Sequence, residues 1–158
     1  MQDDSMICRF EAFLTGITVC HKYIQRIKNA EMTEFGLRGT HVACMFYLYH
    51  KPEGLTASQL CILCAEDKGT ISRSVAELRA RGYVESGGEK NYRAPLKLSP
   101  AGMAIARQMD PIIEAWVSVG GDGLAVEQRE AFYQSLALIS ANLRAKLEQH
   151  DENGKELL

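Results

Sequence analysis

The sequence has no hydrophobic stretch long enough to cross a membrane. Its longest run without a charged residue covers 131–143 and still contains Gln134, Ser140 and Asn142, whereas a membrane helix needs about 20 mostly apolar residues. The first residues, MQDDSM, are acidic, unlike the basic start of a secretory signal peptide. We therefore expect a cytoplasmic protein that has no membrane partner.

Motifs typical of enzymes are also lacking. We find no nucleophile motif, no paired-carboxylate signature and no phosphate-binding glycine loop. The glycines at 120–123 are interpreted as a linker, because no strand–glycine–helix pattern surrounds them. We predict that the protein is not an enzyme and that it uses no cofactor.

Metal-ligand spacing is absent although the chain has five cysteines and four histidines. Cys61 and Cys64 form a CxxC, but a zinc site needs four ligands and no second pair follows at ligand spacing. The histidines show no metal-binding spacing either. We predict no metal site and interpret these cysteines as packed thiols in a reducing cytoplasm.

The chain has little excess charge, since its net charge is -2. The distribution is more informative than the total. Residues 66–97 hold seven basic and five acidic residues, a balance of +2, and residues 98–158 hold five basic and nine acidic, a balance of -4. The positive balance is thus confined to one segment, where an anionic partner would bind in a salt-sensitive way.

The sequence is rich in helical patterns. Its 158 residues suit one domain. Apolar residues recur at helical spacing over about 4–30, 39–50, 99–120 and 125–149. The first and last of these helices carry more apolar surface than a small core can cover, so we expect them to pack against a second copy of the chain.

Between 54 and 102 the pattern changes to two short helices and a hairpin. Thr56 and Gln59 have the spacing of a capping box, and Asp67 is suited to cap the second helix. That second helix has an apolar face made of Ile71, Val75 and Leu78. Two apolar segments, 83–85 and 95–98, flank a glycine-bearing tip and predict a hairpin. Ser99 and Pro100 then begin another helix.

Two helices followed by a hairpin make a winged helix-turn-helix. The predicted fold class is therefore mainly α with a small β-hairpin wing. On the second short helix, the side opposite the apolar face carries Arg73 among small residues, namely Gly69, Ala76 and Ala80. Such a face fits a major groove and lets Arg73 reach a base. Glu77, one turn after Arg73, is expected to hold its guanidinium by an ion pair. The alternative is a solvated helix face with a routine ion pair.

The chain resembles the MarR family of bacterial transcription regulators. The matching residues are Leu55-Thr56, Gln59-Leu60, 67–73, Leu78, 81–85, Arg93, Leu98-Ser99 and Gly102. The resemblance implies a winged core at about 39–98 and dimerisation helices at about 4–30 and 99–149. It also implies a homodimer that binds a pseudo-palindromic operator in double-stranded DNA. The family wing usually carries Asp-x-Arg, where this chain has Asn91-Tyr92-Arg93.

The helix, its first turn and the wing supply our candidate DNA contacts. They are Lys68, Thr70, Ser72, Arg73, Lys90 and Arg93. The resemblance also implies a small-molecule effector between the dimerisation helices and the winged core. Residues that could line such a pocket are His21, Tyr23, Tyr47 and Trp116, although core packing explains them equally well.

The leading functional prediction is a dimeric repressor that an effector releases from DNA. One alternative is a thiol-based redox-sensing regulator on the same scaffold. Cys8 is the candidate thiol because the neighbouring Arg9 favours a thiolate. Another alternative, of a different class, is a winged-helix protein-interaction module that does not bind DNA.

Overall fold

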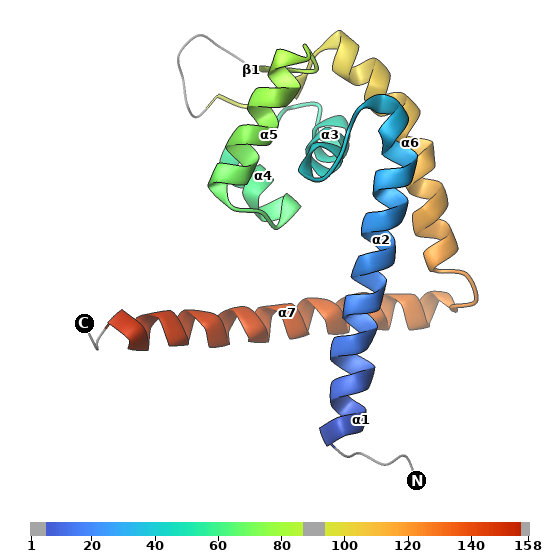
Figure 1. The fold of residues 1–158 in the computed structure, drawn as a ribbon, viewed down its shortest axis with the longest axis vertical. Coiled ribbons are helices and arrows are strands. Elements are labelled where there is room, and N and C mark those ends of the chain that lie inside the picture. Colours follow the sequence, from blue (N-terminus) through green and yellow to red (C-terminus); the bar gives the residue numbers. More distant parts are fainter. Residues whose placement is uncertain (1–5, 87–93, 156–158) are drawn as a thin grey trace. The chain divides into compact units, whose positions relative to one another are not determined.

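The computed structural model describes residues 6–86 and 94–155 (Figure 1). It is mainly helical with one two-stranded antiparallel sheet, as the sequence predicts. The chain divides into two units, Met1–Trp116 and Val117–Leu158. Within the described residues, no helix combines the length and the apolar character needed to cross a membrane.

The predicted first helix is present as a continuous helical segment in four parts. These are α1 (Met6–Phe10), the π-helical turn η1 (Glu11–Thr15), α2 (Gly16–Met32) and the 3-10 turn η2 (Thr33–Phe35). Only Met32 among these residues is buried. The rest of the apolar stripe is exposed in the single chain, at Met6, Ile7, Phe10, Leu14, Ile17, Ile24 and Ile27.

The winged core begins with α3 (Thr40–His50), α4 (Ala57–Cys64) and α5 (Lys68–Ala80). Both predicted caps are confirmed. The Thr56 hydroxyl accepts a hydrogen bond from the Gln59 backbone N–H at 3.2 Å, and the Gln59 side chain accepts one from the Thr56 N–H at 2.8 Å. Asp67 caps α5 by accepting from the Thr70 N–H at 2.9 Å.

The core lies where α3 contacts both α4 and α5. The predicted face of α5 is inside it, since Ile71 and Leu78 are fully buried and Val75 nearly so. Each of these side chains contributes roughly 1.5–3 kcal/mol by leaving water. The same core cluster contains other large side chains that are fully buried, namely Met32, Leu37, Met45, Leu48, Leu60 and Met109.

The hairpin consists of β1 (Val84–Ser86) and β2 (Leu96–Leu98), with Val84 opposite Leu98. Sequence reasoning missed one further pairing. Leu55 forms an isolated antiparallel bridge with Leu96, through hydrogen bonds of 3.0 and 2.8 Å. The bridge ties the base of the hairpin to the segment that leads into α4, so the two short helices and the hairpin form one structure.

Helix α6 (Pro100–Gly120) begins at the predicted cap. The Ser99 hydroxyl accepts a hydrogen bond from the Gly102 N–H at 3.0 Å. Gly102 also lies against the hairpin, because a Cβ at this position would be only 2.0 Å from the Tyr83 carbonyl oxygen. The close approach of helix and strand therefore requires glycine here.

The second unit contains α7 (Val126–Lys155), which runs further than the predicted end at 149. Its apolar residues are exposed in the single chain, at Phe132, Tyr133, Leu138, Leu143 and Leu147. A long helix with this much exposed apolar surface needs a partner to bury it.

We predict that Gly102→Ala destabilises the winged core. Alanine normally favours a helix over glycine by about 1 kcal/mol, but here its Cβ would strike the Tyr83 backbone. We expect a net loss of about 1–3 kcal/mol, measured by chemical denaturation. Gly120→Ala is the matched control, because a Cβ there would meet nothing within 4 Å. Equal stability of the two variants would contradict the packing argument.

Candidate nucleic-acid interface

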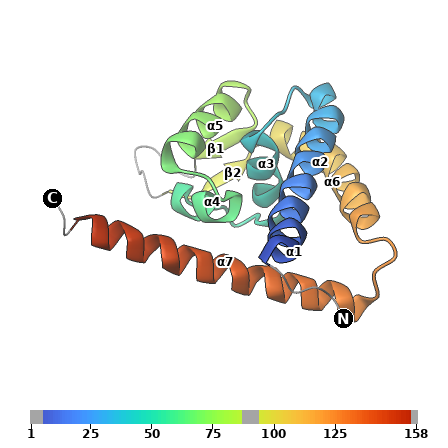
Figure 2. The same cartoon turned by 60° about the horizontal axis from the view of Figure 1, so that its bottom comes forward.

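The exposed face of α5 has the composition that the sequence predicts. Gly69, Arg73, Ala76 and Ala80 are all exposed, while Ile71 on the opposite side is buried. Figure 2 shows α5 beside the strand β1 at the base of the hairpin. A narrow, nearly flat helix face with one arginine can approach a nucleic-acid groove closely.

A chain of hydrogen bonds orders the first turn of α5. Asp67 accepts from the Thr70 N–H at 2.9 Å and from the Thr70 hydroxyl at 2.8 Å. These bonds hold the pKa of Asp67 below its ordinary value, because they favour the ionised carboxylate. The Arg73 guanidinium in turn donates to the Thr70 hydroxyl at 3.2 Å. Thr70 therefore links the cap of the helix to its central arginine.

Gly69 leaves room for this network. A Cβ at Gly69 would lie 3.0 Å from the Asp67 carboxylate and 3.7 Å from the Arg73 guanidinium. The lack of a side chain thus serves two purposes. It keeps the exposed face of the helix flat, and it lets Asp67 and Arg73 approach the same hydroxyl.

The ion-pair partner of Glu77 differs from the one that the sequence predicts. We expected Glu77 to hold Arg73 by an ion pair one turn away, but its carboxylate lies 3.0 Å from Nε2 of His41 on α3. His41 is buried, whereas Glu77 is largely exposed. The pair therefore connects α5 to the core, and the Arg73 guanidinium bonds to the Thr70 hydroxyl instead.

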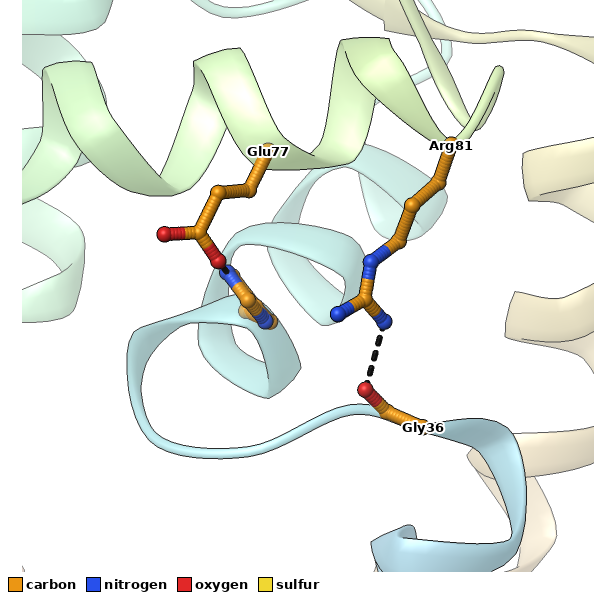
Figure 3. Close-up of polar contacts among 4 residues, drawn as sticks. Gly36, Glu77 and Arg81 are labelled. Carbon is orange, nitrogen blue, oxygen red and sulfur yellow. Dashed lines mark hydrogen bonds and ion pairs between the residues drawn. The ribbon is translucent and has the colours of Figure 1, made fainter.

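One turn further along, Arg81 makes a second connection from the end of α5. Its guanidinium donates to the Gly36 carbonyl in the segment before α3. Figure 3 shows Glu77 and Arg81 reaching from α5 towards this segment. The two contacts and the apolar face hold α5 at a fixed position on α3.

Comparisons with known proteins identify the fold. Residues 35–91 match the model of the MarR family. A MarR-family transcriptional regulator from Silicibacter pomeroyi is 25% identical, with a TM-score of 0.72, over 84% of this chain and 91% of that one. The winged helix of this chain is similar to that of the MarR family in both sequence and fold.

Two further solved structures have lower identity but similar folds. The MepR–DNA complex from S. aureus is 14% identical, with a TM-score of 0.75, over 83% of this chain and 96% of that one. A MarR-family regulator from Neisseria meningitidis is also 14% identical, with a TM-score of 0.76, over 90% of this chain and 98% of that one. No curated protein matches the chain in sequence.

The MarR-family fold places four of the six candidate DNA contacts on α5. Lys68, Ser72 and Arg73 are exposed, and Thr70 is half-buried. The wing candidates Lys90 and Arg93 lie outside the described residues, as does Asn91. Among the described residues, the candidate contacts therefore all lie on α5.

The candidate effector and redox residues occupy different environments. His21 and Tyr23 are exposed on α2, while Tyr47 and Trp116 are half-buried against the core. The Trp116 indole N–H is buried and has no hydrogen-bond partner among the described residues. Cys8 is exposed on α1. In the described part of the chain, no group of three or more potential ligands gathers for a metal ion.

The buried His41 makes the fold sensitive to acid. Burial lowers the pKa of His41 despite the nearby Glu77 carboxylate, which raises it, and Arg81 adds to the lowering. With Nε2–H donated to Glu77, the neutral ring leaves Nδ1 unprotonated, and Nδ1 is buried without a partner. Protonation would place a charged, unpaired N–H at that buried position, which is costly.

We therefore predict a loss of stability below about pH 6.5 that depends on His41. The unfolded state binds the proton more readily than the folded state, so the free energy of unfolding falls as the pH falls through this value. Thermal melts of the wild type should show this slope, and His41→Gln should reduce it. Glu77→Gln should retain or extend it, because the charge that raises the His41 pKa is lost. Identical slopes for the wild type and His41→Gln would exclude His41 as the cause.

Proposed function

We propose that this protein is a homodimeric, sequence-specific DNA-binding transcription regulator, a repressor that a small-molecule effector releases from its operator. The observation that carries the proposal is α5, a capped helix fixed to the core that exposes Arg73 among small residues. The similarity of its fold to S. aureus MepR, whose structure contains DNA, supports this use of the helix.

In the proposed complex, α5 enters the major groove. Arg73 leaves its hydrogen bond with Thr70 and donates to a base edge, and arginine most often selects guanine there. Thr70 and Ser72 contact bases or phosphates, and Lys68 contacts the backbone. Lys90 and Arg93 of the wing are assigned to phosphates or to the adjacent minor groove, where arginine gains from the concentrated negative potential.

A homodimer gives two such helices and matches a pseudo-palindromic operator. Two separate apolar surfaces support self-association. One runs along α1, η1 and α2, with Phe10, Ile17 and Ile24 exposed, and the other runs along α7. Burial of such surfaces is the usual driving force of stable dimers.

An effector site is supported by one buried polar group. The indole N–H of Trp116 has no partner among the described residues, although a buried donor usually has one. A bound organic molecule with an acceptor oxygen would satisfy it. The proposed ligand is therefore an organic molecule that carries a carbonyl or carboxylate.

The proposal is tested by selecting DNA fragments from the source genome with the purified full chain. A regulator should enrich a small set of fragments that share an inverted repeat. Enrichment without a shared sequence, or no enrichment, would contradict sequence-specific binding and favour the protein-interaction alternative.

We predict that Arg73→Ala weakens binding to a selected fragment by about 1–3 kcal/mol and relaxes preference at one base position in each half-site. Arg79→Ala is the control, since it removes the same charge from the last turn of the same helix. It should weaken binding less and leave the sequence preference intact. Mobility-shift titrations against single-base variants of the fragment measure both effects. Unchanged selectivity in Arg73→Ala would remove Arg73 from base recognition.

We also predict that the full chain sediments as a dimer at micromolar concentration. An aspartate at Ile17 would bury a charge at the proposed interface, so Ile17→Asp should shift the equilibrium towards monomer by a factor of ten or more, about 1.4 kcal/mol. Asn29→Asp introduces the same charge at an exposed polar position of α2 and should leave the dimer intact. A monomeric wild type would overturn this part of the proposal.

A further inference from the structure

Two cysteines from different helices of the winged core face each other. Cys44 is fully buried on α3, and Cys64 is the half-buried last residue of α4. Their sulfur atoms are 4.0 Å apart. A disulfide needs a sulfur–sulfur distance of about 2.05 Å, so the pair could close with a displacement of about 2 Å.

We propose that Cys44 and Cys64 form an oxidant-sensitive thiol pair, which a hydroperoxide converts into an intrachain disulfide that lowers the affinity of the protein for DNA. The proposal rests on the proposed function for its effect on DNA, whereas the disulfide itself can be tested without DNA. It differs from the prediction based on Cys8, which is exposed on α1, outside the winged core.

The environment assigns different roles to the two sulfurs. The hydrogen bond between the two thiols lowers the pKa of Cys64, and the Lys28 ammonium acts in the same direction, against burial and the Glu66 carboxylate. The same hydrogen bond, together with burial, raises the pKa of Cys44. Cys64 is also the more accessible of the two. It therefore supplies the thiolate that attacks the oxidant, and Cys44 is the resolving thiol.

The reaction takes place in two balanced steps. The Cys64 thiolate attacks the terminal oxygen of the hydroperoxide, the O–O bond breaks, and the products are a Cys64 sulfenic acid and, after protonation, an alcohol. Cys44 sulfur then attacks the Cys64 sulfur, its proton joins the departing hydroxide, and water leaves. Overall, two thiols lose two protons and two electrons, and the hydroperoxide becomes an alcohol and water.

The position of Cys64 connects this bond to the recognition helix. Ala65 follows Cys64 in the left-handed conformation, with φ 53°. It ends α4 and begins the turn that leads to α5. Asp67, which caps α5, is only three residues from Cys64. Glu66 also accepts a hydrogen bond from Thr40 at 3.1 Å, so the turn is fixed to α3. Pulling Cys64 towards α3 must shift this short turn and with it the first turn of α5.

The test uses the full chain with Cys8, Cys20 and Cys61 changed to serine, which leaves only the pair. Cumene hydroperoxide at a small molar excess should lower the intact mass by about 2 Da and remove both thiols that are titratable in denaturant. Peptide mapping should show Cys44 linked to Cys64 within one chain, and dithiothreitol should reverse the change. In the otherwise native chain, Cys61→Ser should leave the same linkage.

Two matched variants separate the roles of the two sulfurs. In the same background, Cys44→Ala should stop at a Cys64 sulfenic acid that dimedone traps, and Cys64→Ser should leave Cys44 unoxidised. Because Cys44 is buried, Cys64→Ser, at a half-exposed position, remains decisive if Cys44→Ala fails to fold. Absence of oxidation in the three-serine protein, a link between chains, or a Cys61–Cys64 link in the native chain would overturn the proposal.

The effect on DNA is measured on a selected fragment in the same three-serine protein. Oxidation should weaken binding by about tenfold or more, dithiothreitol should restore it, and the Cys64→Ser form should not respond to the oxidant. A disulfide that forms without changing affinity would overturn the regulatory part of the proposal. If the reduced protein binds no fragment, the proposed function fails, but the mass and mapping results still decide whether the thiol pair exists.

Discussion

The attachment of α5 to α3 is the constraint on which the rest of the structure depends. Ile71 and Leu78 are fully buried, and together they contribute several kcal/mol, about 3–6 by area. Apolar burial alone does not fix rotation or sliding of a helix, because it has no direction. The His41–Glu77 pair and the Arg81–Gly36 hydrogen bond are directional, and both come from the same side of α5. They keep the opposite face, which carries Arg73, turned outward.

This arrangement has a cost that a purely structural helix would avoid. His41 is buried with Nδ1 unpaired, and a buried polar atom without a hydrogen-bond partner costs free energy. The His41–Glu77 pair is therefore explained better by the orientation that it gives α5 than by a contribution to stability. The proposed contact of Arg73 with a DNA groove requires a fixed rotation of α5 about its axis, and the directional His41–Glu77 pair favours one rotation where apolar burial alone does not.

Local features of the fold could be predicted from the sequence, and tertiary pairings could not. The capping box at Thr56, the cap at Asp67 and the start of α6 at Ser99 depend on residues three positions apart, so the sequence carries the whole signal. The partner of Glu77 depends on how α3 crosses α5, and the expected pair with Arg73 was wrong. The Leu55–Leu96 bridge was missed for the same reason. The candidate DNA residues on α5 followed from helical periodicity, whereas Arg73's contact with Thr70 required the structure.

The CxxC motif of Cys61 and Cys64 does not indicate which cysteine lies near Cys64 in the fold. Spacing within one helix relates Cys61 to Cys64, but the sulfur that approaches Cys64 belongs to Cys44, twenty residues earlier. The turn after Cys64 is only three residues long, and it contains both a left-handed residue and the cap of α5. A turn this short has few alternative conformations, so a displacement at Cys64 cannot be absorbed before Asp67. The rigidity that would orient Arg73 in the proposed DNA complex is thus the same property that would transmit a bond between Cys44 and Cys64 to the first turn of α5.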